Sequence, residues 1–464
     1  MDASPSADQL SRGSRFSLYL FIPLILAFGV VVEMRGALLQ NRWTDLTVFL
    51  RAAWAIKQGE DVYQVTDTKG LHYHYPPLLA ILLMPLADPP AGVEASGAVP
   101  FPISVAIWYF FSIGSLALGV HMLARALEEN SPVLKARSRP GNHVWWGLRV
   151  WPVLACLPTI GHALSMGQVN VLWLALLCGM GAALVRGRSG QAGLWLAGAI
   201  CLKVLPVFLL VYPLWRRDGR CLAGCAVGLV LGLAVVPSAI LGPEQTLVYG
   251  EEWTRVVLMP AFGMGSDRSR ADELIEVTST QNQALSAVFH NTLFVDWKER
   301  PNQVAPEVRL SAWGVGGLLT ALSLLAAGWR RTNSGLANLL LLGALNINML
   351  LLAPAGHPHY LVLIVPLMMS LLVRQWEREP LARTPSTLPW LLVFHAIAVA
   401  LPLMPNWVVL FNLGLPMYAG LIFWLAGIVS LWQMRRAELA DVPRSDTALP
   451  TLPANESLES QQAA

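Results

Sequence analysis

Long apolar blocks separated by short charged clusters make up most of this 464-residue chain. A helix that crosses a bilayer needs about 20 mostly apolar residues, fewer where it is broken. The pattern therefore predicts an all-α polytopic membrane protein, a bundle of about 10–12 transmembrane helices. The candidate spans are residues 16–39, 101–126, 150–165, 169–185, 191–202, 204–215, 219–241, 310–328, 335–353, 358–374, 387–404 and 408–434.

Two segments need separate treatment. The first span is longer than the apolar part of a secretory signal and lacks a small-residue cleavage site, so we expect it to remain as an anchor. Residues 76–87 are apolar but too short to cross, and they begin with Pro76-Pro77, which favours an extended entry into a helix. We expect a short interfacial or re-entrant helix there.

Arginine and lysine positions predict the orientation, because cytoplasmic loops are enriched in them. The clusters can all be cytoplasmic only if an even number of crossings separates each neighbouring pair. They are Arg12 and Arg15; Arg125, Lys135, Arg137, Arg139 and Arg149; Arg186 and Arg188; Arg216, Arg217 and Arg220; Arg330 and Arg331; Arg374, Arg378 and Arg383; and Arg435 and Arg436.

The stretch between Arg188 and Arg216 admits two topologies. Two short half-depth helices that meet near Lys203 would keep both clusters on one side. A single span with Lys203 reaching the surface would invert everything that follows. We favour the two short helices, because a lysine in mid-membrane is costly unless it lines a cavity or reaches an outer surface.

This topology divides the chain into three parts. Residues 1–15 form a cytoplasmic N-terminus, residues 16–436 one transmembrane domain, and residues 437–464 a polar, disordered cytoplasmic tail. Within the domain, residues 40–100 and 242–309 are the long extracytoplasmic loops, and the first loop carries the short interfacial helix.

Composition narrows the class further. Only 13% of the residues are charged, against about 25% in a typical soluble domain, so lipid is the solvent for most of the chain. A net charge of +3 with scattered basic residues argues against a nucleic-acid partner. The five cysteines lie in or beside apolar segments and are predicted to be small buried hydrophobes, namely Cys156, Cys178, Cys201, Cys221 and Cys225.

The unusual polar residues fall on the extracytoplasmic side of this scheme. Asp45 follows the first span, where a carboxylate suits a catalytic base facing a lipid-linked substrate, or simply a helix cap. His72 and His74 precede Pro76 and would bind a phosphate, a metal, or nothing beyond the interface. Because residues two apart share a face only on a strand, a dedicated metal site is the less favoured of these alternatives.

Further polar clusters lie at the ends of later spans. Gln168 and Asn170 suit sugar hydroxyls, although capping of the following helix is the better explanation for Asn170. Lys203 suits a phosphate at the bilayer face, or snorkels. An amide-rich run, residues 279–286, precedes a predicted amphipathic helix, and His357 and His359 precede a span where a helix start favours phosphate.

The order of these motifs resembles glycosyltransferase family 87, membrane enzymes with the GT-C fold that include polyprenol-phosphate-mannose-dependent mannosyltransferases and related arabinofuranosyltransferases. The resemblance runs from about residue 16 to 375 and rests on the ordered set. The motifs are Asp45, Gly59-Glu60-Asp61-Val62-Tyr63, Tyr75-Pro76-Pro77-Leu78, Gly167-Gln168-Val169-Asn170, Lys203-Val204-Leu205-Pro206, Asn282-Gln283-Ala284-Leu285 and His359-Tyr360.

The resemblance implies a multi-pass protein of the bacterial inner membrane. It would transfer a sugar, mannose as the first expectation, from a polyprenyl-phosphate donor to a glycan or glycolipid acceptor on the extracytoplasmic face. The donor's configuration would be inverted, with Asp45 as general base. Lys203, His359 and His357 would bind the lipid phosphate. Substrate contacts would come from Tyr75, His74, Gln168, Asn170, Asn282 and Gln283.

The resemblance implies no nucleotide sugar and no cofactor, and a divalent metal stays an open alternative. Two positions depart from the family pattern: Ala284 stands where a serine is expected, and His290 where an arginine is common. The alternative functions are a transporter or flippase of lipid-linked saccharides, and a structural membrane protein. A transporter would show related halves and charges deep in several spans.

Overall fold

The structure is a computed structural model that describes residues 12–39, 44–90, 92–93, 97–261, 264, 269–270, 273–274, 277–296, 298–329, 334–378 and 387–440. Residues 1–11 and 441–464 of the predicted termini lie outside the described residues, as do Arg330, Arg331 and Arg383 of the predicted basic clusters. Helix α1(Arg12–Glu33) begins within the segment predicted as the N-terminus, and α22(Leu415–Ala440) continues into the segment predicted as the tail.

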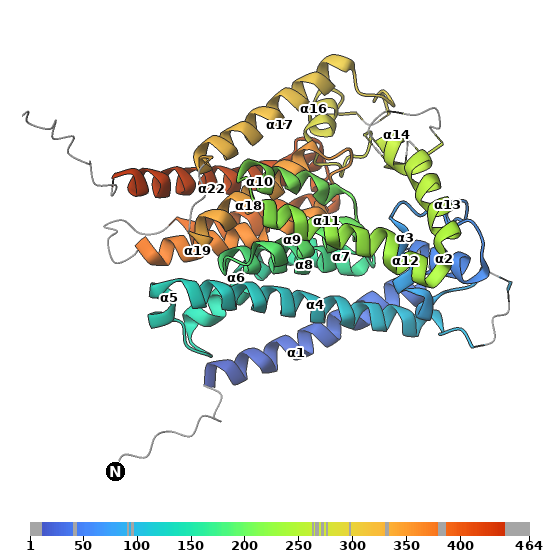
Figure 1. The fold of residues 1–464 in the computed structure, drawn as a ribbon, viewed down its shortest axis with the longest axis horizontal. Coiled ribbons are helices and arrows are strands. Elements are labelled where there is room, and N and C mark those ends of the chain that lie inside the picture. Colours follow the sequence, from blue (N-terminus) through green and yellow to red (C-terminus); the bar gives the residue numbers. More distant parts are fainter. Residues whose placement is uncertain are drawn as a thin grey trace, which may run out of the picture.

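The chain is a bundle of helices that run side by side along the long axis of the molecule (Figure 1). Within the described ranges, seven helices are long and apolar enough to cross a membrane, or eight if one bent pair counts as a span. They are α1 with the π-turn η1(Met34–Leu39), α4(Phe101–Asn130), α11(Gly219–Val230) continuing to α12(Val236–Leu241), α17(Pro306–Ala327), α18(Gly335–Leu352), η6(Pro358–Ile364) with α19(Val365–Arg378), and α22. The predicted all-α polytopic membrane architecture is confirmed.

The remaining predicted spans are shorter or broken helices. Residues 150–165 divide at Cys156 into α6(His143–Ala155) and α7(Leu157–Ser165), with Pro152 inside the first helix. The bent pair consists of Leu388–Leu403 and Pro405–Asn412, which meet at 101°. Prolines account for such breaks, because each removes a backbone donor and clashes with the preceding turn.

Two short helices separate Arg188 from Arg216, as the favoured topology predicted. Helix α9(Ser189–Leu202) stops before Lys203, and the chain returns through η3(Leu205–Leu210) and α10(Val211–Trp215). Both outer ends lie at the same end of the bundle. There, Gly190 touches the start of α11, and the Trp215 indole donates to the carbonyl oxygen of Gly328 at 2.9 Å.

Glycines hold α9 against α11 at very close range. A Cβ at Gly193 would lie 2.0 Å from the carbonyl oxygen of Cys221, and one at Gly224 would lie 2.1 Å from that of Gly190. Small residues spaced four apart allow helix backbones to approach closely in lipid, and Gly224 and Gly228 follow that spacing. Because α9 ends at Lys203, this packing fixes where the lysine lies.

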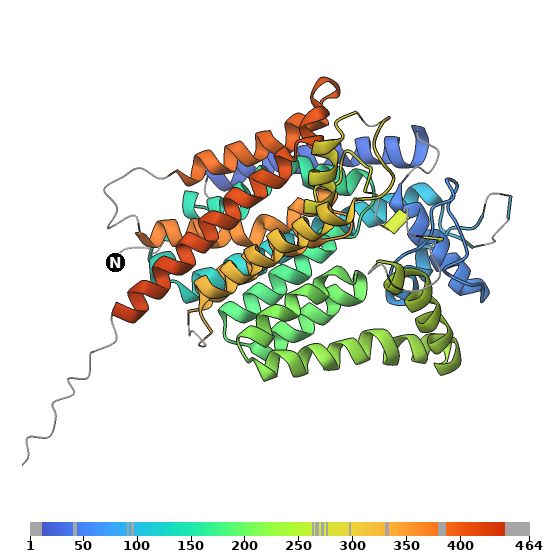
Figure 2. The same cartoon turned by 90° about the horizontal axis from the view of Figure 1, so that it is seen from above.

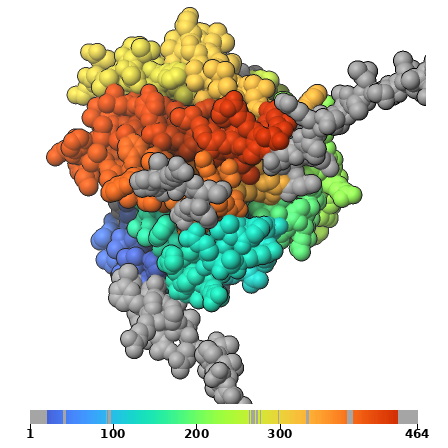
Figure 3. All heavy atoms as spheres, turned by 90° about the vertical axis from the view of Figure 1, so that its left-hand side faces the viewer, coloured from blue at the N-terminus to red at the C-terminus, as the bar shows by residue number. Residues whose placement is uncertain are grey.

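One end of the bundle gathers the predicted cytoplasmic basic residues. Arg186 pairs with Glu129 at 2.8 Å, Arg378 donates to Gln433 at 2.7 Å, and Arg435 donates to Leu325 O at 2.6 Å. Figure 3 looks at this end, where the segments coloured teal and red fill the face between the grey atoms. These three contacts therefore place Arg186, Arg378 and Arg435 against neighbouring helices at this end of the bundle.

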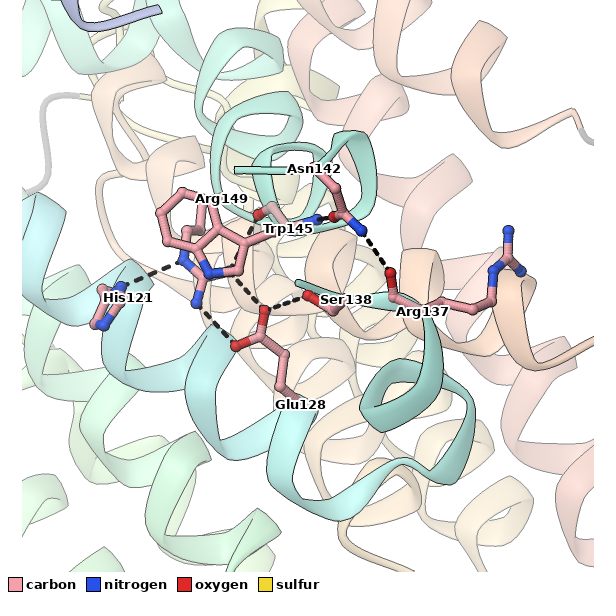
Figure 4. Close-up of polar contacts among 7 residues, drawn as sticks. All are labelled: His121, Glu128, Arg137, Ser138, Asn142, Trp145 and Arg149. Atoms are coloured by element: carbon pink, nitrogen blue, oxygen red, sulfur yellow. Dashed lines mark hydrogen bonds and ion pairs between the residues drawn. The ribbon is translucent and has the colours of Figure 1, made fainter. Parts of the chain in front are cut away.

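A buried polar cluster fastens α4, α5(Pro132–Arg137) and α6 at this end (Figure 4). The Arg149 guanidinium donates to both oxygens of Glu128, at 2.7 and 2.9 Å, and lies 3.9 Å from the centre of the Trp145 ring. The hydroxyl of Ser138 also donates to Glu128, at 2.7 Å. Each polar group has a partner within the cluster, so its role is structural.

The opposite end carries the two long connections. The first contains α2(Asp45–Gln58), α3(Pro77–Leu82) and η2(Met84–Leu86). Helix α3 is the short helix that was predicted within residues 76–87. The second contains α13(Pro243–Trp253), η5(Thr254–Leu258), α14(Met259–Ala261) and α16(Leu285–Leu293). Seen from above in Figure 2, both connections lie at the end away from the C-terminal part of α22. All five cysteines are buried and unpaired, as predicted.

Candidate active site

Helix α2 starts against the turn between α7 and α8(Asn170–Val185). The amide of Asp45 donates to Met166 O at 2.9 Å, and the Trp108 indole donates to Gly167 O at the same distance. Gly167 has a φ of +66°, and a Cβ there would come within 2.6 Å of Leu46 Cβ. Only glycine fits this turn, which delivers Gln168 to Asp45.

Asp45 accepts a hydrogen bond from the side-chain amide of Gln168. Burial raises the pKa of this carboxyl to about 6, because the charged form loses its water. The positive charge of Lys203 and the bond from Gln168 oppose that rise. A carboxylate whose pKa is near neutrality is suited to accept a proton.

Lys203 lies among three aromatic rings. Its ammonium donates to the hydroxyl of Tyr360 at 2.6 Å and lies 4.1 Å from the centre of that ring. The ring centres of Tyr75 and Trp173 are 5.4 and 5.8 Å away, within the range of cation–π attraction. The Tyr360 hydroxyl and these rings therefore hold the ammonium in a half-buried position.

The two predicted histidines adjoin Tyr360. His357 stacks on His359 with ring centres 5.2 Å apart, and His359 lies 4.8 Å from the Tyr360 ring. His359 is buried, and both of its ring nitrogens lack a hydrogen-bond partner. The structure thus brings Asp45, Gln168, Tyr75, Lys203, His357 and His359 into one continuous region, the central site.

Asn170 belongs to the same region, but the capping expectation for it was wrong. Val169 is the N-cap residue of α8, and no side chain caps that end. Asn170 is fully buried, and neither its amide nitrogen nor its amide oxygen has a partner. Trp173 lies one turn further along α8, and its indole nitrogen is also buried without a partner.

Asn282 and Gln283 lie beside the central site and bind backbone. Asn282 Oδ1 accepts from the amides of Ala284 and Gly356, at 3.0 and 2.8 Å. The Gln283 side chain donates to Phe411 O at 3.0 Å, and its oxygen accepts from Met417 N. These amides hold the loop that precedes His357, and a small cavity runs between Gln283, His357 and Tyr360.

His74 and the departures from the family pattern contact the loops at this end of the bundle. His72 and His74 approach the same carboxylate, Glu273, at 2.8 and 3.4 Å, joining the first long connection to the second. Ala284 is the N-cap of α16, and His290 contacts Pro301 O at 2.9 Å. In the part of the chain that the structure describes, no three His, Cys, Asp or Glu side chains are placed to hold a metal ion.

Four residues of this end escaped the sequence-based selection. Tyr360 was quoted only as part of a motif, and His162, Trp173 and Glu273 were not selected. His162 carried a signal, since it is a histidine inside a predicted span. Nothing in the sequence marks Trp173 or Glu273, because tryptophan is common in membrane helices and glutamate is common in polar loops.

The fold is a polytopic membrane bundle, and a carboxylate, a lysine and histidines gather at the central site, which is the kind of intramembrane ionisable cluster that marks a functional site. Residues 73–354 match the model of glycosyltransferase family 87, and the chain belongs to that family. The sequence is 24% identical over 355 residues to the polyprenol-phosphate-mannose-dependent alpha-(1-2)-phosphatidylinositol mannoside mannosyltransferase of Mycobacterium tuberculosis. The alignment covers 73% of this chain and 72% of that relative.

The solved structures to which this chain is similar include two of one protein. The crystal structure of ArnT from Cupriavidus metallidurans bound to undecaprenyl phosphate matches with a TM-score of 0.36 and 16% identity, over 91% of this chain and 79% of that one. The apo structure of the same protein gives a TM-score of 0.32 and 15% identity, over 90% and 77%.

Proposed function

We propose that this membrane glycosyltransferase transfers a sugar, with mannose as the first candidate, from a polyprenyl-phosphate donor to a glycan or glycolipid acceptor. The observation that carries the proposal is the placement of Asp45 and Lys203 in one half-buried site, where Gln168 donates to the carboxylate, Tyr360 holds the ammonium and each charge acts on the other. The printed name of the mycobacterial relative supports the choice of donor.

In this proposal Asp45 removes the proton from the acceptor hydroxyl as that oxygen attacks the anomeric carbon. Its raised pKa keeps the carboxylate basic enough for the transfer. The bond from the anomeric carbon to the phosphate oxygen breaks, and the electron pair leaves with polyprenyl phosphate. The sugar is attacked from the side opposite the leaving group, so its configuration inverts, as the family resemblance implies.

Lys203 is positioned to stabilise the departing phosphate, because its ammonium is fixed by Tyr360 before any substrate arrives. His359 and His357 add ring nitrogens on the same side. Preorganised charge in a site that excludes water is commonly the largest contribution to catalysis. Gln168, Asn170 and Tyr75 are proposed as sugar or acceptor contacts, since Gln168 Oε1 and the whole amide of Asn170 have no partner in the protein.

The reaction is tested with purified full-length protein in lipid nanodiscs. Labelled polyprenyl-phosphate mannose and a panel of lipid acceptors are supplied to wild type, Asp45→Asn and Asp296→Asn. Asp296 is an exposed carboxylate and serves as the matched control. We expect transfer by wild type and the control, and a loss of about a thousandfold or more in Asp45→Asn. If Asp45→Asn transfers the sugar as fast as wild type, Asp45 is not the general base.

The same assay separates transferase from transporter. A flippase would move labelled donor across the bilayer of a proteoliposome without releasing polyprenyl phosphate. Movement of intact donor across the bilayer, without formation of the glycosylated acceptor, would contradict the transferase proposal.

We also propose that the central site faces the extracytoplasmic side, as the basic end of the bundle supports. Cysteines placed at the exposed positions Thr68 and Glu438, at opposite ends, are labelled with an impermeant reagent in intact cells. The buried native cysteines keep the background low. If only the Glu438→Cys variant is labelled, the proposed orientation is wrong and the central site faces the cytoplasm.

A further inference from the structure

The central site contains a cluster of buried polar atoms, and two of its members, on His162 and Trp173, have no role in the proposed reaction. Both ring nitrogens of His359, Nδ1 of His162, the indole nitrogen of Trp173 and the amide of Asn170 are buried and unpartnered. A buried polar group without a partner costs about 1–3 kcal/mol, so a cluster of them at one place marks a position that a ligand completes.

His162 extends the row of groups that begins at Lys203. The lysine bonds Tyr360, the Tyr360 ring lies 4.8 Å from His359, and the His359 ring lies 5.3 Å from His162. Helix α7 carries His162 and packs against η6, which carries His359 and Tyr360. The row therefore runs from η6 onto α7.

The charges around this row are positive. The charged group that acts on His162 is Arg35, from η1, and His359 is acted on by Lys203 and its neighbouring histidines. The negative charge of Asp45 acts on Lys203, at the other end of the row. Positive charge and N–H donors arranged in this way favour an anion with several oxygens.

We propose that His162 is a further phosphate-binding residue, donating to an oxygen of the same polyprenyl phosphate that Lys203 and His359 contact. The inference rests on the proposed function and adds α7 to the phosphate site.

The test measures binding of decaprenyl phosphate, and of decaprenol as the uncharged probe, to the full-length protein in nanodiscs by intrinsic tryptophan fluorescence. The variants are His162→Leu, His162→Gln and His143→Leu, the last being an exposed histidine at the other end of the bundle. We expect His162→Leu to weaken decaprenyl phosphate binding about tenfold or more, and His162→Gln to recover part of it through its amide donor. Decaprenol binding and the His143→Leu control should not change.

The outcomes separate the two proposals. If wild type does not bind decaprenyl phosphate, the proposed function is wrong. If wild type binds and His162→Leu binds equally well, or if decaprenol binding falls by the same factor, His162 is not a phosphate-binding residue.

A second measurement uses wild type alone and so does not depend on the folding of a variant. Diethyl pyrocarbonate modification of His162, read by mass spectrometry, should be reduced by decaprenyl phosphate and not by decaprenol. Equal protection by both probes contradicts the inference.

Discussion

The ammonium of Lys203 donates a hydrogen bond to the hydroxyl of Tyr360 across 157 residues of sequence, at 2.6 Å. This bond joins the break between two short helices to the start of η6, and so links the acid side of the central site to its histidine side. Because the bond joins the two residues, a shift of one helix would displace the other residue as well. The position of the Lys203 ammonium therefore depends on how several helices of the bundle pack together.

Activity should fall as the pH drops through about 6. A base works only when deprotonated, and burial raises the pKa of Asp45 to about 6. Below that value kcat/KM should decrease about tenfold for each pH unit. Gln168→Leu removes a bond that stabilises the carboxylate, so the acid limb of its pH profile should move to higher pH. A limb unchanged in Gln168→Leu, or a limb near pH 4 in wild type, contradicts this assignment, and Asp296→Asn is the control.

Tyr360→Phe should weaken donor binding while leaving the fold intact. The ring stays, but Lys203 loses the oxygen that holds its ammonium. We expect the KM for the donor to rise about fivefold or more, because a hydrogen bond to a charged group contributes about 1.5–3 kcal/mol. Steady-state kinetics measure the change, and Tyr418→Phe, at a tyrosine that is 49% exposed, is the matched control. An unchanged KM would show that Lys203 is held by the rings alone.

Gly193→Ala and Gly224→Ala should destabilise the protein and reduce activity together. Each added methyl would meet backbone within 2.0–2.1 Å, and α9 would be pushed away from α11 together with Lys203. Overpacking of this kind costs about 1–3 kcal/mol. Thermal unfolding in detergent measures it. Gly314→Ala, with no atom within 4 Å of its new Cβ, should unfold at the wild-type temperature.

Asn282→Ala should lower stability as well as activity, because two buried amides, of Ala284 and Gly356, lose their acceptor. The cost is about 1–3 kcal/mol for each unsatisfied group. Asn282→Asp keeps the acceptor oxygen, but it buries a carboxylate and loses the donor to Pro354 O, so it should also be less stable than wild type. A large rise in KM for Asn282→Ala with unchanged unfolding temperature would instead identify Asn282 as a substrate contact.

Arg149→Lys tests the polar cluster at the far end of the bundle. Lysine lacks the two-pronged donor that binds both oxygens of Glu128. Lysine keeps the charge but loses one of the two bonds to Glu128, and a hydrogen bond to a charged group contributes about 1.5–3 kcal/mol. The unfolding temperature should fall, and the donor KM of the folded protein should stay the same. A raised KM would show that this end communicates with the central site.

Much of this protein was determined by its sequence alone. Apolar blocks of spanning length left no soluble fold possible, and the basic clusters required an even number of crossings, which predicted the pair of short helices that meet at Lys203. The ordered motifs predicted the family and most of the central site. These features depend on local composition and on charge, which act over a few residues or through the membrane as a whole.

Only the tertiary structure decided which polar groups bind backbone and which are buried without a partner. Asn170 and Asn282 are the same residue type in similar motifs, yet the amide of Asn170 is buried without a partner and that of Asn282 binds backbone. His162 and Trp173 join the site because α7 and α8 pack against η6. A hydrogen bond is set by distances of about 3 Å between segments far apart in the chain, and such distances are fixed by helix packing rather than by any local pattern.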